Sequence, residues 1–101
     1  MSLTSCSRGP VVTLKNDSAS ELHNVVLSGS GFTESIDTLR PATVHSFSPR
    51  VRGESGIRVQ FDAAGQHYDS DEQGYFEATG GYRVSIVVDR RMKVAVDAKL
   101  Q

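Results

Sequence analysis

The segment IRVQFDA at residues 57–63 decides the fold class, because apolar and polar side chains alternate along its whole length. A period of two residues is typical of a β-strand that buries one face and exposes the other. Ala64-Gly65 follows as a tight turn into a second extended segment at residues 66–69. This stretch therefore predicts a β-hairpin.

The same alternation recurs on both sides of this hairpin. Helical spacing does not persist for more than two turns, and Gly and Ser interrupt the chain often. Seven to nine short strands, about ten residues apart, predict an all-β fold, namely an antiparallel β-sandwich that is immunoglobulin-like or prealbumin-like. The other predicted strands are at 11–15, 22–28, 43–47, 82–88 and 92–96, with weaker segments at 32–39 and 73–78.

The chain of 101 residues fits one domain. We expect a flexible N-terminal tether at residues 1–10 and a β-sandwich domain at residues 11–101. Two stacked sheets enclose side chains of the size of Val, Ile, Leu and Phe. The predicted core consists of Val12, Leu14, Val25, Leu27, Val44, Phe47, Ile57, Val59, Phe61, Phe76, Tyr82, Val84, Ile86 and Val94.

The charge balance and the single cysteine limit the function classes. The formal net charge is −1, whereas a dedicated nucleic-acid binder normally has a strongly basic face. We therefore expect no nucleic-acid partner. Cys6 is the sole cysteine, so an internal disulfide is impossible.

The segment Leu3-Thr4-Ser5-Cys6 resembles the bacterial lipobox, in which Leu and two small residues precede the cysteine that becomes lipidated. The resemblance implies that Cys6 is the lipid attachment site and that acyl chains hold the protein at a membrane. Ser7 follows the cysteine, which in lipoproteins of this kind implies the outer membrane. The implied location is the bacterial cell envelope, facing the periplasm or the surface. The remaining chain resembles in a general way the small β-sandwich domains of bacterial envelope proteins.

The acidic segment at residues 69–74 is a candidate metal site. Its spacing is similar to the start of a calcium loop, but Gln73 and Gly80 stand where an EF-hand needs acidic ligands. His67, Asp69 and Asp71 would share one face of an extended strand and could chelate zinc. The alternative is a solvated acidic turn, or a surface strand with a polar outward face.

Two basic groups could contact anions such as lipid headgroups or polysaccharide. The alternative is that these charges only keep turns solvated and discourage aggregation at strand edges. The first group is Arg50, Arg52 and Arg58, and the second is Arg90, Arg91 and Lys93 at a predicted hairpin tip.

Catalysis is not expected, and no cofactor is expected either. The chain lacks a G-x-S-x-G elbow, and His23 and His45 are isolated in the sequence. The sequence thus predicts a non-enzymatic, lipid-anchored envelope protein that acts as a binding or structural module, with a protein or a polysaccharide as its partner. One alternative is a calcium- or zinc-dependent binding module that uses residues 67–71. Another is a subunit of an assembly that pairs by strand addition through residues 32–39.

Overall fold

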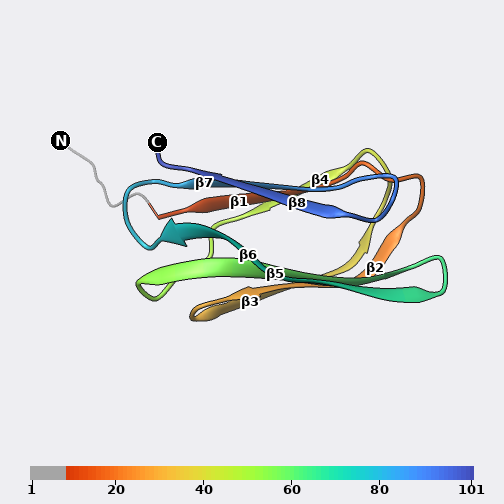
Figure 1. Ribbon diagram of the computed structural model, residues 1–101, viewed down its shortest axis with the longest axis horizontal. Coiled ribbons are helices and arrows are strands. Elements are labelled where there is room, and N and C mark those ends of the chain that lie inside the picture. Colours follow the sequence, from red (N-terminus) through yellow and green to blue (C-terminus); the bar gives the residue numbers. More distant parts are fainter. Residues whose placement is uncertain (1–8) are drawn as a thin grey trace.

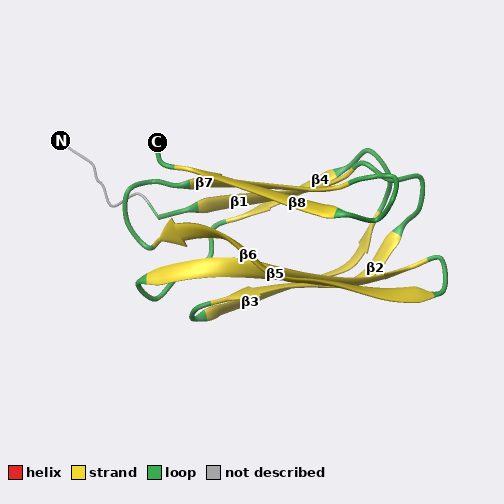
Figure 2. Cartoon of the chain, viewed as in Figure 1, coloured by secondary structure: helices red, strands yellow, loops and turns green. Residues whose placement is uncertain are grey.

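A computed structural model of the chain describes residues 9–101. Eight strands form two four-stranded sheets that stack face to face, so the predicted β-sandwich is confirmed (Figures 1 and 2). No helix that could cross a membrane occurs in residues 9–101. The strands are β1 (Val11–Asn16), β2 (Leu22–Gly29), β3 (Phe32–Leu39), β4 (Val44–Phe47), β5 (Glu54–Ala63), β6 (Gln66–Glu77), β7 (Arg83–Val88) and β8 (Val94–Lys99).

The strand order is β4-β1-β7-β8 in one sheet and β3-β2-β5-β6 in the other. Five of the strand pairs are antiparallel. The sixth pair, β1 with β7, is parallel, with Val12 opposite Val84 and Leu14 opposite Ile86. Parallel neighbours need a long connection. Here the chain between β1 and β7 includes all four strands of the other sheet as well as β4.

The core lies between the two sheets and contains most of the side chains expected there. Ten of the fourteen predicted core residues are buried, while Phe47, Tyr82 and Val94 are partly buried against them. Val44 is a wrong prediction, since its side chain is 55% exposed. It lies opposite Lys15 on the outer face, because His45 and Phe47 take the inward positions of β4. The buried apolar residues that the prediction missed are Leu22, Leu39, Ala63 and Val88.

Strand β6 corrects the prediction of two strands joined by an acidic turn. It is continuous over twelve residues, and its register against β5 shifts twice. Asp71 and Gly74 adopt positive φ values of 59° and 76° there. The side chains of the irregular segment make hydrogen bonds of their own: Val59 N–H donates to Ser70 Oγ at 3.0 Å, and Asp71 N–H donates to Asp69 Oδ1 at 3.0 Å. β-Bulges thus replace the expected turn.

A buried asparagine joins the ends of three segments. Asn16 ends β1 with 0% exposure. Its Nδ2 donates to Ser20 O at 2.7 Å and to Leu39 O, at the end of β3, at 2.9 Å. Its Oδ1 accepts from Ser18 N–H at 3.0 Å and from Ser18 Oγ–H at 2.6 Å. All four hydrogen-bonding positions of the amide are occupied, so this side chain links the two sheets at one end of the sandwich.

Candidate binding surface

The two sheets differ in the sign of the charges on their strands. We call β3-β2-β5-β6 the acidic sheet, because its strands carry eight carboxylates and one arginine. We call β4-β1-β7-β8 the basic sheet, because its strands carry three basic side chains and one carboxylate. The charged residues of the acidic sheet are Glu34, Asp37, Glu54, Arg58, Asp62, Asp69, Asp71, Glu72 and Glu77, and those of the basic sheet are Lys15, Arg83, Asp97 and Lys99. A net charge of −1 therefore conceals a strongly polarised surface.

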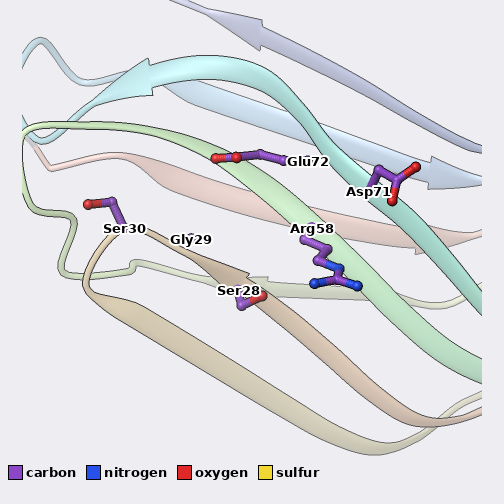
Figure 3. A pocket seen from close by; sticks show the side chains of 6 residues that line it. All are labelled: Ser28, Gly29, Ser30, Arg58, Asp71 and Glu72. Carbon is purple, nitrogen blue, oxygen red and sulfur yellow. The ribbon is translucent and has the colours of Figure 1, made fainter.

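A hollow of about 460 Å³ opens on the acidic sheet. Figure 3 shows Arg58 on β5 between Ser28 on β2 and Asp71 on β6. Glu72 lies across Gly56 of β5, whose N–H donates to Glu72 Oε2 at 3.1 Å. A Cβ at position 56 would come within 2.6 Å of Glu72 Cγ, so the glycine makes room for this carboxylate. The lining residues are Ser28, Gly29, Ser30, Arg58, Asp71 and Glu72.

Arg58 is held at the hollow by a forked ion pair. Its Nε donates to Asp69 Oδ1 at 2.8 Å, and its Nη2 donates to the second carboxylate oxygen. These hydrogen bonds are the main reason that the pKa of Asp69 falls to about 2, and the N–H of Asp71 lowers it further. The hydrogen bonds to Asp69 also raise the pKa of Arg58. Because the arginine is neutralised by its partner, Asp71 and Glu72 give the hollow its negative character.

A second polar cluster lies where β5 and β6 meet near their hairpin. His67 Nδ1 lies 2.7 Å from Asp62 Oδ1, and Asn24 Nδ2 donates to Asp62 Oδ2 at 3.1 Å. The hydrogen bond with His67, and next the one from Asn24, lowers the pKa of Asp62. His67 is 59% exposed, so this cluster faces solvent.

The proposed metal ligands are not brought together. His67 pairs with Asp62, Asp69 pairs with Arg58, and Asp71 belongs to the bulged part of β6. In the part of the chain that the structure describes, no three His, Cys, Asp or Glu side chains lie close enough to share a metal ion. His67 and Asp69 of the zinc or calcium hypothesis thus each pair with a different side chain of the fold.

The histidines on β2 and β4 also meet carboxylates. His45 Nε2 lies 2.8 Å from Glu34 Oε2 and joins β4 to β3 across the rim of the sandwich. His23 lies 3.3 Å from Thr38 Oγ1 and 3.4 Å from Glu21 Oε1. Thr38, His23 and Glu21 are arranged in the order of a nucleophile, a base and an orienting acid, but the side chains of His23 and Glu21 are about half exposed. Catalysis by such a group needs oxyanion donors and a site that excludes water. The half-exposed side chains of His23 and Glu21 lie in contact with water instead.

The basic hairpin tip lies between β7 and β8, where the side chains of Arg90, Arg91 and Lys93 are exposed. Asp89 Oδ1 accepts from Lys93 N–H at 2.9 Å and from Arg91 N–H at 2.8 Å, which closes the turn. The hydrogen bond from Lys93 is the main reason that the pKa of Asp89 is lowered. The three basic side chains thus project from one end of the basic sheet.

The other predicted basic group divides into two parts. Arg50 and Arg52 lie in the connection from β4 to β5, where Arg52 N–H donates to Ser30 O at 3.0 Å. Arg58 instead belongs to the acidic sheet, where it pairs with Asp69. Cys6, the predicted lipid attachment site, lies outside the described residues.

Neither the hollow nor the difference in charge between the acidic and the basic sheet was predicted from the sequence. Both depend on which strands are neighbours, and the alternation of side chains along single strands does not contain that information. The available signal was the concentration of acidic residues in the third, fifth and sixth strands.

The chain is similar in fold to a solved structure, a protein from Eubacterium rectale determined by NMR. The TM-score is 0.60 at 20% sequence identity, and the match covers 93% of this chain and 91% of that protein. At this identity the similarity concerns the fold alone. No protein family and no curated protein matches the sequence.

Proposed function

We propose that this chain is a non-enzymatic, lipid-anchored protein of the bacterial cell envelope, in which the sandwich is a binding module. The observation that carries the proposal is the opposite charge of the two sheets. An anionic lipid surface attracts Lys and Arg and repels carboxylates. A sandwich with one basic and one acidic sheet thus has a side suited to the membrane and a side suited to a partner.

The chain path supports the same orientation. The proposed anchor, Cys6, precedes Gly9-Pro10, which lead directly into β1. This strand lies within the basic sheet, between β4 and β7. Lys15, Arg83 and Lys99 belong to that sheet, and the basic hairpin tip between β7 and β8 extends it. A lipid at Cys6 would therefore bring the basic sheet close to lipid headgroups and leave the acidic sheet free for a protein or polysaccharide.

Of the two sandwich topologies considered, we propose the prealbumin-like one. An immunoglobulin constant-type domain places its first strand in a sheet with its second, fourth and fifth strands. Here β1 shares a sheet with β4, β7 and β8 instead. Two four-stranded sheets with this order agree with the prealbumin-like alternative, which by itself implies no activity.

The orientation is testable because Cys6 is the sole cysteine. Maleimide-lipid coupled at Cys6 attaches the chain to vesicles, either anionic (phosphatidylglycerol) or neutral (phosphatidylcholine). We expect the acetylation of Lys15 and Lys99, followed by mass spectrometry, to slow by about threefold or more on anionic vesicles. Labelling of Asp37 with carbodiimide and glycinamide serves as the control and should be unchanged. Equal rates on both vesicles, or protection of Asp37, would contradict the orientation.

A further inference from the structure

The described sandwich has four edge strands, and three of them carry features that prevent pairing with another chain. Such features are short length, proline, β-bulges, lysine and cover by other segments. β4 has four residues and is followed closely by Pro49, and β6 has bulges. β8 is covered in part by β6, because Gln73 Nε2 donates to Val94 O at 3.4 Å and Gly74 lies against Val96.

The fourth edge, β3, is long and has no proline, lysine or β-bulge; its charged residues are Glu34, which contacts His45 of β4, and the exposed Asp37. It has eight residues and pairs with β2 at seven positions. Its sequence, FTESIDTL, contains no proline, lysine or glycine, and none of its residues has a positive φ. Thr33, Ser35 and Asp37 are exposed, while Phe32 and Ile36 pack partly against the core. A long, regular edge of this kind offers unpaired backbone groups to another strand.

We propose that the edge of β3 is a docking site for an extended, basic peptide segment that adds a fifth strand to the acidic sheet. Backbone hydrogen bonds would supply much of the affinity, and the side chains that alternate along β3 would select the partner. The proposal rests on the proposed function only in taking the domain to be a binding module.

The charges and the pattern of β3 define the occupant. The strand carries Glu34 and Asp37 and no basic residue. Directly opposed residues on paired strands interact, so lysine or arginine is favoured opposite these two carboxylates. Phe32 and Ile36 are half-buried and favour apolar residues opposite them. The predicted ligand thus has apolar residues opposite Phe32 and Ile36, basic residues opposite Glu34 and Asp37, and small polar residues opposite Thr33 and Ser35.

A second copy of the chain fits this edge poorly. Two β3 strands paired with each other would bring two copies each of Glu34 and Asp37 to one seam without any compensating basic residue from either strand. Like charges that face each other across strands are destabilising. His45 contacts Glu34 within each chain, whereas Asp37 is exposed. Charge complementarity therefore favours a basic peptide over self-association.

The experiment titrates the full chain with the synthetic peptide Ac-GKVTKTVG-amide and follows backbone amides by NMR. The order of its residues places lysine opposite Asp37 and Glu34 in an antiparallel pair. The control peptide, Ac-GEVTETVG-amide, carries glutamate in place of lysine. We expect saturable shifts centred on β3 and a Kd at least about tenfold weaker for the control. Higher salt, from about 50 to 500 mM, should weaken the lysine peptide.

Matched variants test the location. Ser35→Lys adds a charge on the outer face of β3, and Ser85→Lys makes the same change on the exposed face of the basic sheet. We expect the first to weaken peptide binding about threefold or more, and the second to leave the Kd unchanged.

Three results would overturn the proposal. They are the absence of saturable binding up to about 1 mM peptide, shifts centred on another edge, and a dimer in light scattering that pairs through β3. The peptide titration needs no lipid. The docking proposal for β3 can therefore be wrong while the membrane proposal is right, and the membrane proposal can be wrong while the docking proposal is right.

Discussion

Asn16 offers the sharpest test of how the two sheets are held together. Asn16→Ala removes four hydrogen bonds and leaves the carbonyls of Ser20 and Leu39 without this partner. Each bond contributes about 1 kcal/mol net, and buried groups left unpaired cost more. We therefore expect a loss of about 2–4 kcal/mol in the free energy of unfolding. In a domain of this size that corresponds to a fall of about 10–20 °C in Tm.

Asn16→Asp distinguishes the effect of the lost hydrogen bonds from the effect of lost packing. The new carboxyl keeps the shape of the amide, but an oxygen replaces the Nδ2 donor that faces two carbonyls. Burial raises the pKa of this carboxyl in the folded state above its unfolded value of about 3.9. The folded state then holds its proton more tightly, so the stability of the variant falls as pH rises from about 4 to 7.

The assay is thermal unfolding by circular dichroism at pH 4 and pH 7, with Ser35→Ala as the exposed control. The control should stay within about 0.5 kcal/mol of the parent chain. The importance of these hydrogen bonds would be disproved if Asn16→Ala lowered Tm by less than about 4 °C. It would also be disproved if Asn16→Asp lost the same stability relative to the parent chain at both pH values.

Three further predictions concern β6 and its neighbours. Gly74→Ala should lower Tm more than Gly65→Ala, because both residues have positive φ (76° and 80°) but only position 74 places a Cβ 2.9 Å from Val96 Cγ1; equal losses would contradict this. Asp69 has a pKa of about 2 against 3.8 unperturbed, so its stabilising contribution is present above pH 3.8 and is lost as pH falls toward 2. In acid titrations the stability gap between the parent and Asp69→Asn should therefore narrow over that window, and a constant gap would refute the assignment. Millimolar calcium or zinc should raise Tm no more than sodium chloride of equal ionic strength, because His67 and Asp69 already bind protein side chains; a rise of several degrees would instead support the metal-dependent alternative.

The strand pattern was predictable wherever one face of a strand is apolar. IRVQFDA at residues 57–63 became the regular part of β5, and its four apolar side chains are all buried. The sequence of β4, VHSF, has an apolar residue on each face, so alternation could not choose between Val44 and His45. Phe47 packs against the core, so His45, two residues before it, lies on the same inward face, where it contacts Glu34 of β3.

Longer-range features had no local signal. The parallel pairing of β1 with β7 joins segments about seventy residues apart, and hydrophobic pattern alone does not specify such a partner. The acidic segment in β6 contains a glycine and several residues typical of turns, and a bulge has the same composition as a turn. The forked pair of Arg58 with Asp69 depends on the shifted register between β5 and β6. The candidate binding surface therefore followed from the sheet order and not from any motif.

The most direct test of a lipid-anchored binding module is the intact mass of the full-length native protein, purified from membranes of its own organism. We predict a mature chain that begins at Cys6 and carries the added mass of acyl groups. A soluble, unmodified product whose chain extends upstream of Cys6 would contradict it.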